Sequence, residues 1–122
     1  MTTTLAEPSA TTIQALPARV DLELYTGDDF VLVLTVTDQN GDPADLTGCV
    51  VRAQIRAELA AWEVAGIFAP TIEANRIWLH LTGQVSAGLP QRGVWDARLT
   101  DREAQVTTLT AGRVLMTQEV TR

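Results

Sequence analysis

The amino-acid sequence predicts an all-β domain, an antiparallel sandwich or barrel of about seven or eight short strands. From Arg19 onward, apolar and polar residues alternate with a period of two, which is the pattern of half-buried strands. Turn residues separate these stretches at intervals of roughly 8–15 residues. No helical stretch of about ten or more residues lies between strands to cross over a parallel sheet, which disfavours an α/β fold.

Three strands are expected in the first half of the domain. Residues 20–25 alternate cleanly and end at a Gly-Asp turn over residues 26–29. Residues 30–37 are apolar or threonine on both faces, which predicts a central strand that is at least partly covered on both sides. The Asn-Gly pair within residues 38–43 is the strongest turn signal in the chain, and residues 49–56 alternate again as a third strand.

The second half predicts four further strands, at residues 64–72, 76–81, 93–100 and 106–120. Residues 57–63 are too few for an isolated helix and are interpreted as a loop, whereas residues 82–89 predict a short helical or turn segment. Residues 101–104 are a polar hairpin loop, and Gly112 is expected to interrupt the last strand as a bulge or bend. The three tryptophans are expected to supply much of the core.

The first eighteen residues have a different composition and are predicted to form an extended or disordered arm, followed by the sandwich domain over residues 19–122. Thr, Ala, Ser and Pro dominate the arm, and Pro8 and Pro17 break any helix. Two interpretations stay open: a flexible terminus, or an arm that orders on a neighbouring subunit. In the second case the candidate anchors are Leu5, Ile13 and Leu16.

Composition excludes several partners and settings. The net charge is −6 with a pI near 4.6, and the basic residues are nine arginines with no lysine, so neither nucleic acid nor an anionic membrane is an expected partner. No apolar stretch approaches the ~18 residues of a membrane span, and the N-terminus lacks the pattern of a secretion signal. Cys49 alone cannot form an internal disulfide and is expected to be a buried, inert thiol in a protein made in a reducing cytoplasm.

No pattern of catalytic residues is present, so we expect a non-enzymatic protein. His80 is the single histidine, and it lies in a predicted strand as a structural or solvent-facing residue. Neither Ser9 nor Ser86 lies in a nucleophile elbow, and the glycines are dispersed at turns instead of forming a phosphate loop.

One stretch superficially resembles a metal site. Asp38, Asn40 and Asp42 have the spacing of the first half of a calcium loop. However, glycine falls at the fourth position of the loop instead of the sixth, and Cys49 occupies the twelfth position, where the loop requires glutamate. The sequence therefore predicts no metal and no cofactor.

Arg52 and Arg56 are the candidate interaction residues of the domain itself. They lie four apart on one predicted strand and so share a face, where they form surface ion pairs or dock a partner. Along the sequence, the arginines do not cluster into one basic stripe.

Several strings of residues resemble a recurrent phage module. They are Thr26-Gly27-Asp28-Asp29-Phe30, the run NGDPADLTG at residues 40–48, the run VVRAQIR at residues 50–56, Trp95-Asp96, the run TLTAG at residues 108–112, and residues 120–122. Together they are similar to the N-terminal domain of siphophage baseplate upper proteins and related tail-fibre-attachment proteins. The resemblance covers roughly residues 20–122 and implies an immunoglobulin-like β-sandwich that links a fibre or receptor-binding element to a tail or baseplate.

From this resemblance we expect a structural virion protein of a tailed bacteriophage, synthesised in the host cytoplasm. It would act as a tail or baseplate adaptor that attaches or stabilises fibres, with tail, baseplate, fibre or capsid subunits as partners and a possible homo-oligomer. Family members usually continue into a longer C-terminal portion, whereas this chain stops with the domain, which favours a stand-alone adaptor or decoration subunit. The alternatives are a capsid decoration protein and a non-virion β-sandwich binding module.

Overall fold

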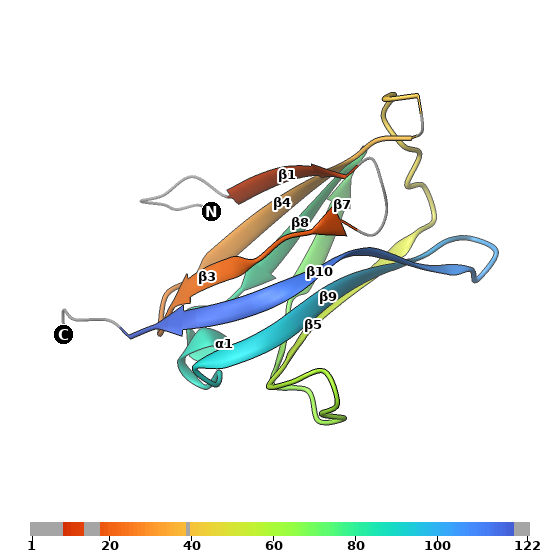
Figure 1. Cartoon of the computed structure of the whole chain (residues 1–122). Helices are drawn as coiled ribbons and strands as arrows, with labels where there is room; N and C mark the ends of the chain where they lie inside the picture. The colour runs from red at the N-terminus through yellow and green to blue at the C-terminus, as the bar shows by residue number, and fades with distance from the viewer. Residues whose placement is uncertain (1–8, 14–17, 39, 119–122) are drawn as a thin grey trace.

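A computed structural model describes residues 9–13, 18–38 and 40–118, as ten strand segments and one short helix (Figure 1). The elements are β1 (Ser9–Ile13), β2 (Ala18–Arg19), β3 (Leu22–Tyr25), β4 (Phe30–Val36), β5 (Val50–Arg56), β6 (Gly66–Ile67), β7 (Ala69–Glu73), β8 (Arg76–Leu81), α1 (Gly83–Ala87), β9 (Arg92–Thr100) and β10 (Val106–Thr117). The predicted all-β class is therefore confirmed. No helix in the described ranges is long and apolar enough to cross a membrane.

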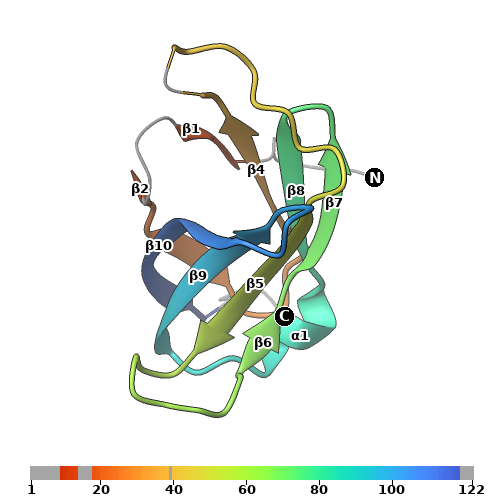
Figure 2. The same ribbon diagram turned by 90° about the vertical axis from the view of Figure 1, so that its right-hand side faces the viewer.

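The strands form two sheets that pack face to face as a sandwich (Figure 2). One sheet has the order β1-β4-β8-β7, and the other has the order β2-β10-β9-β5-β6 with β3 also paired to β10. With β1, β4, β5, β7, β8, β9 and β10 taken as strands A to G, these orders are the ABED and GFC arrangements of the immunoglobulin fold. The predicted sandwich is thus immunoglobulin-like in strand order.

Not every strand pair is antiparallel. β1 is parallel to β4, and both β2 and β3 are parallel to β10. Parallel neighbours require a long connection. Between β1 and β4, the long connection runs through β2 and β3, which lie in the opposite sheet. Between β3 and β10, it includes most of the domain, because these strands come from opposite ends of the chain.

The core between the sheets is made by the inward positions of the alternating strands, as predicted. It includes Leu22, Leu24, Leu32, Leu34, Val51, Ala53, Ile55, Ile77, Leu79, Leu81, Trp95, Ala97, Leu109 and Val114. The Trp95 ring lies 5.8 Å from the ring of Phe68, and its Nε1 donates to the carbonyl oxygen of Val20 at 2.7 Å. Only Trp95 of the three tryptophans is fully buried, since Trp78 is half-buried and Trp62 is 90% exposed. The expectation of a core built from three tryptophans is therefore wrong.

Residues 64–72 do not form the single strand that their sequence predicts. They divide into β6 in one sheet and β7 in the other, with Phe68 between them. Phe68 is 1% exposed, and its N–H donates to the carbonyl oxygen of Ala53 at 3.0 Å. The buried ring anchors the chain at the point where it passes from one sheet to the other. The alternation of apolar and polar residues does not reveal such a crossing, because it reports only which side chains face inward.

The irregularity in the last strand also lies elsewhere than predicted. The register of β10 against β9 shifts between Thr108 and Thr110, whereas Gly112 pairs regularly with Trp95. A Cβ atom at residue 112 would overlap the carbonyl oxygen of Val20. Glycine is required there because another backbone passes close to the strand, and not because the strand bends.

Part of the predicted arm lies on the sandwich itself. The backbone of β1 runs beside β4 in register from Ser9 opposite Leu32 to Ile13 opposite Val36. This stretch is extended, as predicted, but it belongs to the domain's own sheet. Leu5 and Leu16 lie outside the described residues, and the division of the chain at residue 18 stays a prediction.

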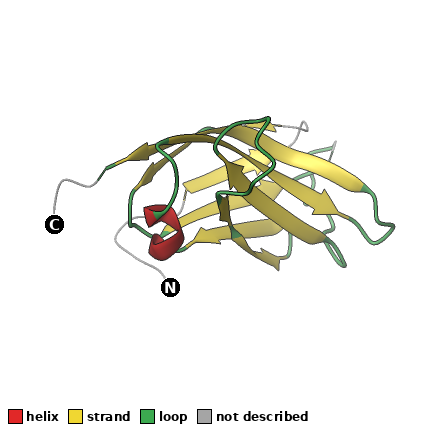
Figure 3. Ribbon diagram, turned by 90° about the horizontal axis from the view of Figure 1, so that it is seen from below, coloured by secondary structure: helices red, strands yellow, loops and turns green. Residues whose placement is uncertain are grey.

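The short helix closes one end of the sandwich, as Figure 3 shows, and confirms the helical segment expected within residues 82–89. The Oγ1 of Thr82 caps it by accepting from the N–H of Val85 at 3.3 Å. The buried Ser86 hydroxyl accepts from the N–H of Gly27 at 3.0 Å and lies 2.9 Å from the carbonyl oxygen of Asp28. This serine ties the helix to the turn that precedes β4, which is a structural role.

Candidate interaction surface

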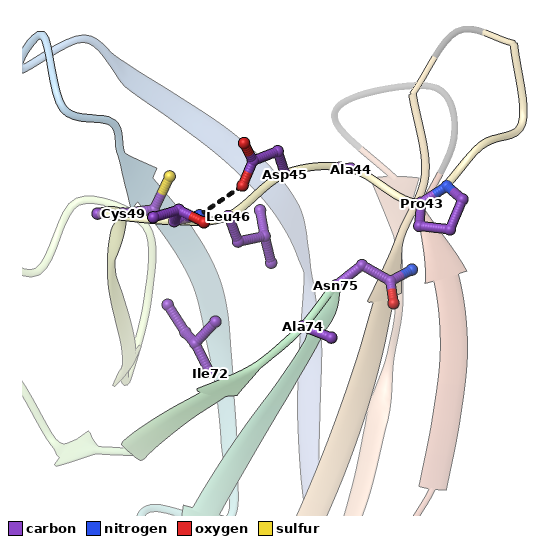
Figure 4. Close-up of a pocket in the computed structure, with 10 residues that line it drawn as sticks. Pro43, Ala44, Asp45, Leu46, Cys49, Ile72, Ala74 and Asn75 are labelled. Atoms are coloured by element: carbon purple, nitrogen blue, oxygen red, sulfur yellow. Dashed lines mark hydrogen bonds between the residues drawn. The ribbon is translucent and has the colours of Figure 1, made fainter.

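A hollow on the described surface lies at the end of the sandwich where β5 begins (Figure 4). Its volume is about 450 Å³, and its walls come from residues 43–49 and from Ile72, Ala74 and Asn75. The Asp45 carboxylate accepts from the N–H of Thr47 at 3.0 Å, and hydrogen bonds from the side chain and backbone of Thr47 lower the pKa of Asp45. Cys49, expected to be buried, is half-buried here. Asp45 is thus engaged by its own turn, and the described walls bring no second carboxylate and no histidine or arginine to the hollow.

The stretch that superficially resembles a calcium loop is a hydrogen-bonded turn. The Oδ1 of Asp38 accepts from the N–H groups of Asn40 and Asp42 at 2.9 and 3.0 Å. Asp38 therefore serves its own backbone, as aspartate does in an Asx turn. Among the residues that the structure describes, no three His, Cys, Asp or Glu side chains come together in a group that could hold a metal ion.

The outer face of β5, β9 and β10 gathers positive charge. We call this surface the arginine face, and its five arginines are Arg52, Arg56, Arg92, Arg98 and Arg113. Strand pairing sets them in rows across the sheet: Arg52 lies opposite Arg98, and Arg56 and Arg113 lie on either side of Val94. The arginines do not cluster along the sequence, but the register of three strands brings five of them to one face.

Little on these strands neutralises the arginines. Asp96 is the one acidic residue of the three strands, and its Oδ2 lies 3.8 Å from the Nε of Arg98. Both side chains of that pair are about half exposed, so the contact stabilises by only about 0–1 kcal/mol. Like charges directly opposite each other destabilise a sheet. Glu23, which pairs with Leu115, and Asp21, which accepts from the N–H of Arg113, add negative charge beside β10, but the five arginines still outnumber these acids and Asp96, so the face is positive on a chain whose total charge is −6.

An apolar protrusion adjoins this face. The loop between β5 and β6 exposes Leu59 and Trp62, which are 89% and 90% exposed, and we call these two side chains the apolar tip. Arg56 supports the loop, since its Nη1 donates to the carbonyl oxygen of Ala61 at 2.7 Å. The N–H of Ala61 in turn donates to the carbonyl oxygen of Glu58 at 3.1 Å. Exposed tryptophan on a hydrogen-bonded loop is typical of protein–protein contact sites.

The structure thus brings two of the predicted interaction residues together and places the backbone of a third in the other sheet. Arg52 and Arg56 share the arginine face, and Arg56 also holds the apolar tip. Ile13 contributes its backbone to β1, in the other sheet. His80 is exposed on the outer face of β8, as expected of a solvent-facing histidine. The apolar tip was not predicted, although a tryptophan within a short polar-flanked loop was the signal that could have found it.

Comparison with known proteins gives a match at the level of structure. No family model and no curated protein sequence matches the chain. The solved N-terminal domain of phage TP901-1 ORF48 is similar, with a TM-score of 0.58 over 89% of this chain and 97% of that domain. The chain has the fold of this phage-protein domain. Sequence identity is 12%, so the match carries the fold alone, in agreement with the sandwich that the phage-module resemblance implied.

Proposed function

We propose that the chain is a structural protein of a tailed-phage virion, a tail or baseplate adaptor that attaches or stabilises fibres. The observation that carries this proposal is the match to the phage TP901-1 ORF48 domain, which extends over nearly the whole of both chains. The strings of residues that resemble baseplate upper proteins and tail-fibre-attachment proteins support the same proposal independently of the fold. In this role the protein acts by binding and not by catalysis.

Two surfaces suit such a role. The arginine face offers planar guanidinium groups that pair with carboxylates in bidentate geometry. The apolar tip offers a tryptophan of the kind that anchors interfaces by filling a pocket on the partner. Together they would contact other virion proteins, whether tail, baseplate, fibre or capsid subunits.

Localisation on purified virions tests the proposal. Gold-labelled antibodies against the chain should mark the tail tip or the fibre bases. Label over the capsid would replace the adaptor role with capsid decoration. Absence of label from intact particles would contradict a virion role and leave a non-virion binding module.

The contribution of the apolar tip can be tested in the same particles. Virions should incorporate less of a Leu59→Ser/Trp62→Ser variant than of the parent protein when both are quantified by immunoblot. His80→Ser is the matched control, because this exposed residue lies on the other sheet and its replacement should leave incorporation unchanged. Equal incorporation of all three proteins would exclude the apolar tip as a contact.

A further inference from the structure

Opposite charges are segregated onto two surfaces of this molecule. The arginine face lies along the side of the sandwich, on the outward positions of β5, β9 and β10. The end of the sandwich where β9 finishes and β5 begins is acidic instead. Figures 1 and 2 show the loops that build this end, between β4 and β5 and between β9 and β10.

We call the second surface the acidic end. Its acidic residues are Asp38, Asp42, Asp45, Asp101 and Glu103. Arg102 is the one basic residue in the two loops as far as they are described, and its side chain lies where a Cβ atom on Gly48 would stand, so the loops pack together. Five acids against one arginine leave a net of four negative charges, opposite in sign to the arginine face.

We propose that the arginine face of one copy of this chain binds the acidic end of a second copy. The inference rests on the proposed function, because it takes the contact surface of that function and names a partner for it. Charge complementarity favours a second copy as the partner of the arginine face, because the chain itself carries an exposed surface of opposite charge. Such complementarity steers association and fixes register.

The positions of the two surfaces define the kind of assembly. One lies on the side of the sandwich and the other at its end, so a copy can use both at once with two different neighbours (Figure 1). A contact between unlike surfaces is heterologous, and repeated heterologous contacts form a closed ring or an open filament.

Placing acids opposite the arginines would also relieve the repulsion within the sheet. Arg52 and Arg98 lie directly opposite each other, and Asp96 is their one acidic neighbour on these strands. Carboxylates from a second copy would accept from these guanidinium groups. Apolar contact could add to this pairing at the border of the two surfaces, where Val50 and Val106 flank Thr100 and are each more than half exposed.

The test measures the mass of the purified full chain by light scattering. At about 50 mM salt, where surface charges are weakly screened, the mass should exceed the 13.2 kDa of one chain and rise with protein concentration. At about 1 M salt the same sample should return to a single chain, because exposed charge pairs are then screened.

Two charge-reversal variants sharpen the test. Arg52→Glu/Arg98→Glu removes the arginine face, and Asp42→Arg/Glu103→Arg removes the acidic end. Asp38, Asp45 and Asp101 are retained because their carboxylates accept backbone hydrogen bonds in their turns. Each variant should be monomeric alone. An equimolar mixture should assemble again, because the intact arginine face of one variant meets the intact acidic end of the other.

Arg76→Glu is the matched control, since this exposed arginine lies on β8 in the other sheet, and its assembly should equal that of the parent chain. Circular dichroism and the melting temperature establish that every variant is folded. A parent chain that stays monomeric at low salt, or a mixture that forms no dimer, overturns the inference. If that happens while gold label still marks the tail, the proposed function stands and the arginine face binds another acidic protein.

Discussion

Trp95 and Trp62 are the same residue type in opposite environments. Trp95 is 3% exposed, packs its ring at a tilt against Phe68 and donates from Nε1 to the carbonyl oxygen of Val20, whereas Trp62 is 90% exposed in a loop. The difference follows from position: Trp95 occupies an inward position of β9, and Trp62 lies where no strand pairs the chain. Burial of the first stabilises the fold, and exposure of the second leaves it free for a partner.

The same contrast separates the two faces of β5 and β9. Their inward positions are filled by Val51, Ala53, Ile55 and Ala97, which are almost completely buried. Their outward positions carry Arg52, Arg56 and Arg98, which contribute little to the core. We therefore expect substitutions on the inner face to change stability and substitutions on the outer face to change binding.

Replacing Trp95 should give the largest effect. Trp95→Ala leaves a large cavity beside Phe68 and removes the donor to Val20, so the free energy of unfolding should fall by about 3–5 kcal/mol. Urea denaturation followed by circular dichroism measures it. A loss below about 1 kcal/mol would show that Trp95 is not part of the core described here.

Gly112 tests how closely the segment before β3 lies on β10. A Cβ at Gly112 would overlap the carbonyl oxygen of Val20, so Gly112→Ala should cost about 1–3 kcal/mol. Gly88→Ala is the control, since a Cβ there meets its nearest atom at 3.8 Å, an ordinary contact. Equal melting temperatures for the two variants would contradict this close approach.

A substitution on the arginine face should leave stability unchanged or raise it, in contrast to the two substitutions above. Arg52→Thr removes a positive charge opposite Arg98, so stability should stay the same or rise by about 0.2–1 kcal/mol. The effect should shrink in about 1 M salt. Thermal melts at low and high salt measure both quantities, and a clear loss of stability would assign Arg52 a role within the fold.

A substitution at the apolar tip should hardly change the stability of the fold. Trp62→Ala should change the free energy of unfolding by no more than about 0.5 kcal/mol, because the side chain is almost fully exposed. The same variant should lose the tryptophan fluorescence that acrylamide quenches most readily. If quenching were unchanged, Trp62 would be shielded and the contrast with Trp95 would fail.

The smallest expected effect is a loss of stability at acidic pH. The N–H of Arg113 donates to the Asp21 carboxylate, and this hydrogen bond, with that from Arg19, lowers the pKa of Asp21 below its ordinary value. A lowered pKa stabilises the fold above the unfolded pKa, and that contribution is lost as the pH falls through the folded value. Melting temperatures of the parent chain and Asp21→Asn should therefore converge between about pH 6 and about pH 2. Asp45→Asn should behave likewise, because the pKa of Asp45 is lowered by Thr47.

The sequence by itself determined the fold class and most elements of this protein. Alternation placed Ile77, Leu79 and Leu81 inward on β8, and the turn residues separated the strands, because side-chain period and turn chemistry are local properties. Local patterns also predicted a short helical or turn segment at residues 82–89, where the helix lies, and the shared face of Arg52 and Arg56.

Only the tertiary structure decided which strands are neighbours, and with them the candidate site. Phe68 is where the chain changes sheets, and Gly112 is determined by a backbone segment about ninety residues away in sequence. Arg98 and Arg113 join Arg52 and Arg56 through strand register, which depends on long-range hydrogen bonding between strands. A charged surface assembled from three strands has no signature in any one of them, because its charges become neighbours only when the sheet forms.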